Sequence, residues 1–310
     1  MACFLFYDEN FKTLDFGPGH PMRGDRYEKA LEEFKKDGIL EKVEMRKVEM
    51  IDEDILCLFH TSTYVEKVKK ISEEGQGIIG PDTPGYKGIY EAALLSVSAT
   101  IFGVKSLLKN ECEVAINICG GWHHAFENTG RGFCIFNDIA VAGNFLLKEG
   151  VEKIMIIDYD AHHGDGTQRA FYSSKKVFTI SLHQNPETLY PFLTGVKEEI
   201  GEGEGKGFNR NFPLSFNCKD EEFIENFKEV EEVINNFKPE FLILQMGVDG
   251  SKECFISNMK LTGESYNYAS YKIRESQKKI GFELLSLGGG GFVHPMLGKN
   301  WGIQINNFTN

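Results

Sequence analysis

The sequence predicts an α/β protein built on a parallel β-sheet with helices on both faces. Three observations support this fold class. Short apolar runs recur along the chain, and segments with helical spacing of apolar residues lie between them. The runs lack the polar alternation of a half-exposed strand, as expected for strands buried on both faces of a sheet. Strands that alternate with helices form parallel sheets covered on both sides.

Five apolar runs are predicted to be strands. In chain order they cover residues 113–119, 153–160, 176–183, 241–249 and 283–291. Their length and near-continuous apolar character suit the interior of a parallel sheet. Helical spacing of apolar residues is found in four segments. These segments are residues 26–36, 139–149, 221–237 and 266–279.

The composition is that of a globular protein with an acidic surplus. Hydrophobic residues make up 41% and charged residues 26% of the 310 residues, which excludes a disordered or collagen-like chain. Lysine and arginine number 34 against 46 aspartate and glutamate residues, so the net charge is −12. This charge disfavours direct binding to nucleic-acid phosphates and is compatible with a cationic substrate.

Several features bear on where the protein resides. We find no stretch that approaches the roughly 18 apolar residues of a membrane span. The N-terminal apolar run lacks the preceding basic residues of a signal peptide. The seven cysteines are scattered and never form a C-x-x-C pair, which favours a reducing compartment. We therefore expect a cytoplasmic protein that does not enter a membrane. The sequence makes no prediction of the oligomeric state.

Polar and glycine residues follow each predicted strand. The first run continues into GGWHHA and the second into DYDAHHGDG, while the others end in SLHQ, GVD and GGGGF. Ligands of open parallel sheets bind beyond the carboxyl ends of the strands. Because five strands deliver His, Asp and Gly to that edge, we expect these residues to converge on one site.

Two of these strand ends predict a metal site. Alternate residues of an extended segment point the same way, so Asp158, Asp160 and His162 can project together. Aspartate and neutral histidine bind zinc and related divalent metals. Asp160, His162 and Asp249 would make a three-ligand site that leaves positions open for water and substrate. The alternative is a polar loop with capping aspartates, and Asp249 on a separate strand end favours the metal.

The adjacent histidines His123 and His124 are the second candidate feature. Their burial requires partners. Asp158 and Asp165 remain once the metal ligands are assigned, and each could accept a proton from one imidazole. The site would then hold a metal, a water and a general base. The alternative is a pair of hydrogen-bonded core histidines, which we would favour if the pair stood alone.

Together these motifs resemble the histone deacetylase family, which includes acetoin-utilisation proteins and acetylpolyamine amidohydrolases. The motifs that carry the resemblance are GGWHHA, GRGFCIFNDIA, IIDYDAHHGDGTQRAF, ISLH, LQMGVD and LGGGG. Their order and spacing match from about residue 15 to residue 291. The resemblance implies the arginase/deacetylase fold and a Zn²⁺ or Fe²⁺ ion. The implied reaction is hydrolysis of an N-acyl amide on a lysine of a protein or on a polyamine.

The resemblance also assigns roles to single residues. The implied metal ligands are Asp160, His162 and Asp249. The implied histidine pairs are His123 with Asp158 and His124 with Asp165, and His124 matches the residue usually taken as general base. The residues implied to contact substrate or product are Gly132, Phe133 and Tyr190 in an acyl-lysine tunnel, Asp82 at its rim and Arg26 near an acetate exit. A structural potassium ion is implied at Asp158, Asp160, His162, Ser181 and Leu182.

The sequence departs from the family at Phe292. The glycine run of the family is normally followed by a tyrosine whose hydroxyl donates to the developing oxyanion, and phenylalanine lacks this donor. Three interpretations follow. The protein is a slow or specialised deacylase, or His294 supplies a donor instead, or the protein binds substrate with almost no turnover. The third would make it a deacetylase-like binding or regulatory protein.

We expect residues 1–310 to form one domain. The predicted site draws on segments from Arg26 to Phe292, and no division of the chain leaves it intact. A two-metal hydrolase of the arginase type would share the fold and use more aspartates. The GG-x-HHA and GFC motifs point away from that alternative.

Overall fold

Eight strands pair into one sheet in the computed structural model, which describes residues 2–293 and 295–310. The strands are β1 (Cys3–Tyr7), β2 (Glu44–Lys47), β5 (Val114–Asn117), β6 (Ile154–Asp158), β7 (Val177–Gln184), β8 (Asn209–Leu214), β9 (Phe241–Gln245) and β10 (Glu283–Leu287). Their order across the sheet is β2-β1-β5-β10-β9-β6-β7-β8, and every neighbouring pair is parallel. A separate antiparallel pair consists of β3 (Gln76–Gly80) and β4 (Thr83–Tyr86).

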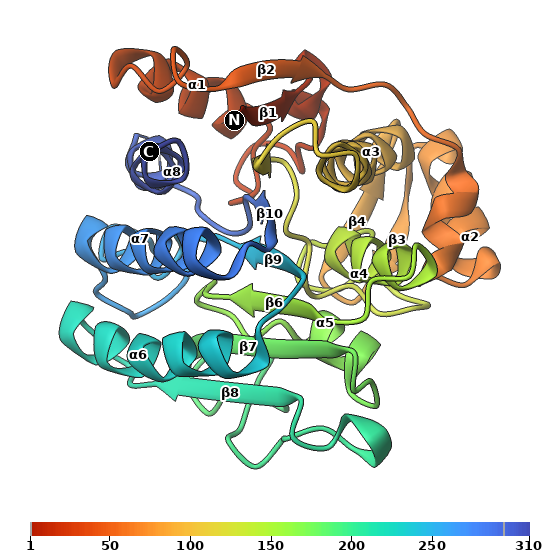
Figure 1. Cartoon of the computed structure of the whole chain (residues 1–310). Helices are drawn as coiled ribbons and strands as arrows, with labels where there is room; N and C mark the ends of the chain where they lie inside the picture. The colour runs from red at the N-terminus through yellow and green to blue at the C-terminus, as the bar shows by residue number, and fades with distance from the viewer. Residues whose placement is uncertain (1, 294) are drawn as a thin grey trace.

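Helices cover both faces of the sheet (Figure 1). One layer contains α1 (Arg26–Lys36), α6 (Asp220–Phe237), α7 (Gly263–Ile280) and α8 (Met296–Phe308). The other contains α2 (Ser62–Glu74), α3 (Ile89–Leu108), α4 (Asp138–Lys148) and α5 (Asp165–Phe171). Short 3₁₀ helices lie at Glu9–Thr13, Glu53–Leu58 and Gly203–Gly205. Within the first layer α8 packs against both α1 and α7, and α7 packs against α6. The predicted fold class, a parallel sheet flanked by helices on both faces, is confirmed.

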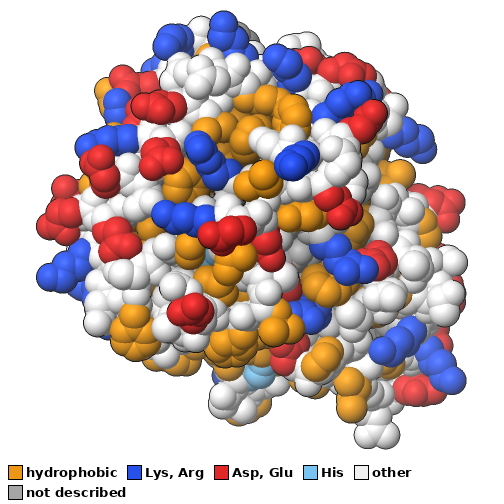
Figure 2. Space-filling view, turned by 90° about the horizontal axis from the view of Figure 1, so that it is seen from below, with side chains coloured by type: hydrophobic (Ala, Val, Ile, Leu, Met, Phe, Trp, Pro, Cys, Tyr) orange, Lys and Arg blue, Asp and Glu red, His pale blue; other side chains and the backbone are white. Residues whose placement is uncertain are grey.

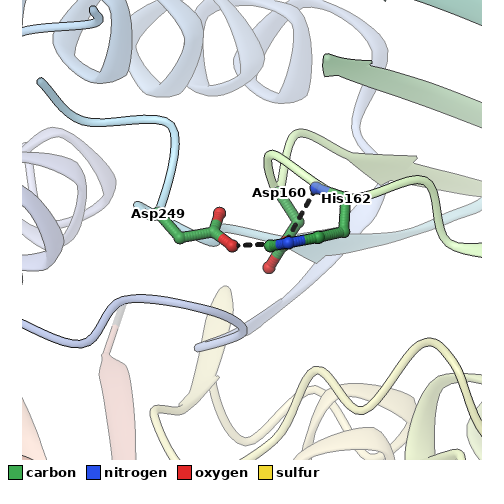
Figure 3. Close-up of side chains that lie close together, drawn as sticks. All are labelled: Asp160, His162 and Asp249. Carbon is green, nitrogen blue, oxygen red and sulfur yellow. Dashed lines mark hydrogen bonds and ion pairs between the residues drawn. The ribbon is translucent and has the colours of Figure 1, made fainter. Parts of the chain in front are cut away.

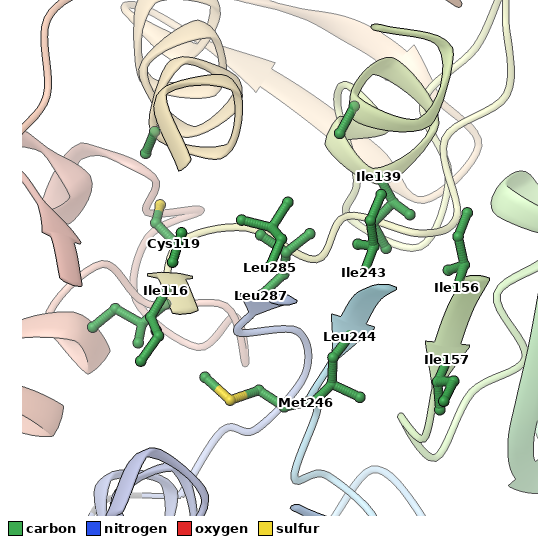
Figure 4. Packing of buried hydrophobic residues seen from close by; sticks show 14 of the residues in the cluster. Ile116, Cys119, Ile139, Ile156, Ile157, Ile243, Leu244, Met246, Leu285 and Leu287 are labelled. Atoms are coloured by element: carbon green, nitrogen blue, oxygen red, sulfur yellow. The ribbon is translucent and has the colours of Figure 1, made fainter. Parts of the chain in front are cut away.

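The core lies between the sheet and its two helical layers. Figure 4 shows Ile156 and Ile243 on one face of the sheet, with Ile157 and Leu244 on the other. All four side chains are at most 1% exposed. Successive residues of a strand point to opposite faces, so a strand covered on both sides must be apolar throughout. The continuous apolar runs in the sequence follow from this arrangement.

The observed strands end earlier than the predicted runs. The run over residues 241–249 pairs only as far as Gln245, and the run over residues 283–291 only as far as Leu287. The remaining residues of each run leave the sheet as loops at its carboxyl edge. These loops carry Asp249 and the four glycines that precede Phe292.

The expectation that no segment of the chain approaches a membrane span in length and composition was wrong. Helix α3 is long and apolar enough to cross a membrane by length and composition. Most of it is buried inside the protein, where it packs on β1, β5 and β10 and against α2 and α4. A helix that is apolar on all sides is either a membrane span or a buried core helix. Its burial identifies α3 as a core helix.

Charge is distributed over the surface without one dominant patch in the view of Figure 2. Lys and Arg side chains alternate there with Asp and Glu, and hydrophobic side chains gather near the middle of the face. Broad binding to nucleic-acid phosphates requires clustered basic residues. This face lacks such a cluster among the residues described.

Candidate active site

A cavity of about 240 Å³ opens at the carboxyl edge of the sheet. Most of the predicted site residues line it. They are Arg26, Asp82, His123, His124, Gly132, Phe133, Asp160, His162, Tyr190, Asp249 and Phe292. The loops after β5, β6, β9 and β10 deliver eight of these residues, because the carboxyl ends of parallel strands meet at one edge. The other two predicted residues, Asp158 and Asp165, lie behind the histidines.

Asp160, His162 and Asp249 form a cluster that could hold a metal ion. Their ligand atoms all lie within 4.8 Å of one another. Asp160 and His162 come from the loop after β6, and Asp249 comes from the loop after β9 (Figure 3). Nδ1 of His162 lies 2.8 Å from Oδ2 of Asp249 and 3.1 Å from Oδ1 of Asp160.

The electrostatics of this cluster fit a cation. Burial and the neighbouring Asp160 carboxylate raise the pKa of Asp249 to about 6. Burial acts to lower the pKa of His162, but the charges of Asp249 and Asp160 outweigh it and raise that pKa to about 10. Both shifts reflect an excess of buried negative charge, which a divalent ion would balance. Two carboxylates and one imidazole are ligands that Zn²⁺ and Fe²⁺ accept.

Neighbouring groups hold the two carboxylates in place. The amide Nε2 of Gln245 and the backbone N–H of Gly290 both donate to Oδ2 of Asp160, at 2.8 and 2.7 Å. The backbone N–H of Ala161 donates to Oδ1 of Asp249 at 2.7 Å. Such outer contacts fix the orientation of ligand side chains. The sequence reasoning missed Gln245, whose only signal is a polar residue at the end of a buried apolar strand.

The tandem histidines are each bound to a buried carboxylate. Nδ1 of His123 lies 2.6 Å from Oδ2 of Asp158, and Nδ1 of His124 lies 2.7 Å from Oδ1 of Asp165. Since a carboxylate accepts, Nδ1 donates in both pairs, and Nε2 is left on the opposite side of each ring. Burial and the charge of His123 lower the pKa of His124 to about 4. His124 is therefore neutral near pH 7 and able to accept a proton.

A tight turn at Arg131–Cys134 shapes one wall of the cavity. The backbone N–H groups of Arg131 and Cys134 donate to each other's carbonyl oxygens at 3.1 and 2.7 Å. The two central residues, Gly132 and Phe133, have φ values of +52° and +67°. Two successive positive φ values are the signature of a mirror-image type I′ turn. The N–H of Gly132 donates to Oδ1 of Asp82 at 2.9 Å, which ties the predicted rim aspartate to this turn.

Substitution of Gly132 by alanine is expected to destabilise the protein by at least ~1 kcal/mol, since positive φ strains an L-residue. A Cβ at this position would lie 2.2 Å from Cδ2 of His124, so the histidine would also have to move. Urea denaturation measures the loss. Gly203→Ala is the matched control, because Gly203 has a φ of +54° and no atom within 4 Å of its Cβ position. Equal losses in both variants would exclude a contribution from the His124 contact.

Aromatic rings line the approach to the metal cluster. The ring of Tyr190 meets that of His124 edge to face, with centroids 5.0 Å apart. Phe133, which also lines the cavity, packs against His20 with ring centroids 4.4 Å apart. Aromatic rings therefore form part of the cavity wall. His20 is a second residue that the sequence reasoning did not assign.

Arg26 and Phe292 lie together on the cavity wall. Arg26 is 2% exposed, and its guanidinium carbon lies 5.6 Å from the centre of the Phe292 ring. Nη2 of Arg26 donates to the carbonyl oxygen of Gly289, and Nε has no hydrogen-bond partner among the residues described. The alternative donor His294 lies outside the described residues. The ring at position 292 thus borders the cavity without a hydroxyl.

The residues expected around a potassium ion lie on β6, on β7 and on the loop after β6. Asp158 and Ser181 are direct neighbours in the sheet register, and Asp160 and His162 follow Asp158 along the chain. The hydroxyl of Ser181 is also 2.8 Å from Nδ1 of His183. The potassium site remains a prediction.

The fold and this site define the class of protein, and comparison with known proteins defines the family. The architecture is the arginase/deacetylase fold. A model of the histone deacetylase domain matches residues 20–308, so the chain belongs to the histone deacetylase family.

Two similar curated proteins are a probable deacetylase of Archaeoglobus fulgidus and the acetoin utilization protein AcuC of Bacillus subtilis. The first is 37% identical over 86% of this chain and 74% of its own length. The second is 31% identical over 93% of this chain and 77% of its own length.

Two crystal structures show the same fold. One is an HDAC homologue complexed with SAHA, which is 32% identical with a TM-score of 0.90. The other is an HDAC homologue from Aquifex aeolicus, which is 31% identical with a TM-score of 0.89. Each match covers 100% of this chain and 84% of the other.

Proposed function

We propose that the protein is a metal-dependent deacylase that hydrolyses the amide of an N-acylated lysine or an N-acylated polyamine. One observation carries the proposal. The metal-ligand cluster Asp160, His162 and Asp249 and the pairs His123–Asp158 and His124–Asp165 border one aromatic cavity. This combination supplies the metal ligands and the general base that amide hydrolysis by an activated water needs.

Asp160, His162 and Asp249 would hold Zn²⁺ or Fe²⁺. The bound ion would polarise the substrate carbonyl and lower the pKa of a bound water. We assign His124 as the group that accepts the proton of the attacking water, because it matches the general base of the family and lines the cavity. Asp165 would fix its tautomer. No cysteine is needed as a nucleophile.

The cavity walls suit a long apolar stem that ends in an amide. Phe133 and Tyr190 would enclose the methylene groups of the amine, which pack well on aromatic faces. Asp82 at the rim would accept a hydrogen bond from a peptide backbone or pair with a second ammonium group. Arg26 would hold the released carboxylate. Both acetyl-lysine in a protein and acetylated polyamines satisfy these contacts.

Three further proposals accompany this one. We propose a cytoplasmic location, which is compatible with the seven cysteines, all within the described residues and all free. We propose one domain over residues 1–310, since the sheet takes strands from both ends of the chain. We also propose a structural potassium ion near Asp158 and Ser181.

Phe292 favours a second candidate function, a deacetylase-like binding protein with little turnover. The two functions are separated by measuring activity and ligand binding on the same preparation. The purified protein is loaded with Zn²⁺ or Fe²⁺ and given an acetyl-lysine peptide and an acetylpolyamine. Binding of a hydroxamate is measured in parallel. Acetate release supports the deacylase, and hydroxamate binding without turnover supports the binding protein. Absence of both would contradict both proposals.

A further inference from the structure

We propose that Arg131 is a positioning residue for the pair His124–Asp165. This inference rests on the proposed function, because it concerns the residue assigned as general base. Arg131 precedes the tunnel residues Gly132 and Phe133 in the same turn. Its side chain is turned toward Asp165 and forms an ion pair behind His124.

The carboxylate of Asp165 is buried, and both of its oxygens have partners. Its side chain is 2% exposed. Oδ1 accepts from Nδ1 of His124 at 2.7 Å and from the backbone N–H of Gly166 at 3.1 Å. Oδ2 faces Nη2 of Arg131 at 3.0 Å. A buried charge needs such partners, so removal of Arg131 would leave Oδ2 without its counter-charge.

Aromatic contacts hold the guanidinium in place. Its central carbon lies 4.5 Å from the centre of the Phe126 ring and 5.8 Å from the centre of the Tyr190 ring. Arginine stacks well on aromatic faces and keeps its charge at any working pH. Arg131 therefore links the tunnel wall to Asp165, the first residue of α5.

The second histidine pair has a different environment. Oδ1 of Asp158 accepts from the backbone N–H of Asp160 at 3.1 Å, and Oδ2 meets His123. Within the described ranges, no arginine or lysine forms an ion pair with Asp158. Of the two histidine–aspartate pairs, only His124–Asp165 thus has an arginine beside its carboxylate among the residues described. By occupying Oδ2, Arg131 leaves Oδ1 to His124 and fixes the direction in which Nε2 faces the cavity.

The kinetic test compares Arg131→Gln and Arg131→Lys with the control Arg169→Gln. The guanidinium carbon of Arg169 lies 5.0 Å from the centre of the same Phe126 ring. Its guanidinium, however, pairs with the carboxylate of Glu127 at the protein surface. Loss of a residue that orients a metal ligand lowers activity roughly 10- to 100-fold, and by analogy we expect kcat of Arg131→Gln to fall about 10-fold with KM nearly unchanged. Arg131→Lys keeps the charge and should recover part of kcat. Arg169→Gln should match the parent protein.

A second readout does not depend on turnover. The hydrogen-bonded Nδ1–H proton of His124 gives a downfield imidazole resonance, which is identified by its loss in His124→Gln. We expect Arg131→Gln to shift this resonance and Arg169→Gln to leave it in place. An unshifted resonance in Arg131→Gln, or a fall in kcat equal to that of Arg169→Gln, would overturn the role of Arg131. If the parent protein is inactive but the resonance still shifts in Arg131→Gln, the result would count against the proposed function and not against the role of Arg131.

Discussion

Replacement of Phe292 by tyrosine is expected to raise kcat roughly 100- to 1,000-fold, the usual worth of one preorganised oxyanion donor. The ring at this position already borders the cavity that holds Asp160, His162 and Asp249. A hydroxyl added to it would donate to the oxygen on which negative charge develops. The gain should appear mainly in kcat, because that charge exists only in the transition state.

The loop that carries Phe292 is well placed to present such a donor. The N–H of Gly290 donates to the metal-ligand carboxylate of Asp160, and the N–H of Gly289 donates to the carbonyl oxygen of Gly120 at 2.8 Å. These contacts fix the loop relative to the proposed metal. The guanidinium carbon of Arg26 lies 5.6 Å from the centre of the Phe292 ring and restricts the movement of that ring on one side.

The measurement compares Phe292→Tyr with the parent protein on an acetyl-lysine peptide and an acetylpolyamine, with Zn²⁺ supplied. Phe255→Tyr is the control for an added hydroxyl, since Phe255 is 67% exposed and sits one residue before the cavity-lining Ile256. It should leave kcat unchanged. Equal and robust activity of parent and Phe292→Tyr would show that the missing donor does not limit the rate.

The sequence predicted five buried strands of the sheet and missed both edge strands and the interior strand β1, whose apolar run CFLFY was assessed only as a signal peptide. The interior strands are covered on both faces, so their runs are apolar throughout. Edge strand β2 has the sequence EMRK with all four residues exposed, and β8 reads NRNFPL. Neither contains an apolar run that marks a strand. Helix α3 was missed for the opposite reason, because burial on nearly every side removes the helical period from its sequence.

The sequence could predict the site residues that directly follow a buried strand. It could not predict the residues that hold those side chains in place through contacts between distant parts of the chain. His123, Asp160 and Asp249 each follow a buried run, and parallel strands must bring such ends together. Arg131 carries no such signal, and the only signal of Gln245 is its place as the polar last residue of a buried strand. Arg131 reaches Asp165 across 34 positions, and Gln245 reaches Asp160 from a neighbouring strand. Only the folded chain brings these partners together.

Loss of a metal ligand is the second large effect expected. Asp249→Asn should lower kcat/KM by more than ~100-fold. Even the substitution of a residue that only hydrogen-bonds to a metal ligand lowers metal affinity or activity roughly 10- to 100-fold. Asparagine keeps the size of the side chain and removes the charge that balances the cation. Neighbouring contacts of the ligand would survive in part, since Ala161 donates to Oδ1. Assays of acetate release at a fixed Zn²⁺ concentration measure the change.

Binding of the metal to the folded protein gives a readout without substrate. A ligand at 100 times its Kd stabilises the folded state by about 2.7 kcal/mol, which for a chain of this length raises Tm by about 4 °C. The parent protein should show this rise on addition of Zn²⁺ after treatment with a chelator, and Asp249→Asn should not. Asp37→Asn, at an exposed position beyond α1, should keep the full rise. A rise of the same size in Asp249→Asn would place the metal elsewhere, because the remaining carboxylate and imidazole cannot balance a divalent charge as three ligands do.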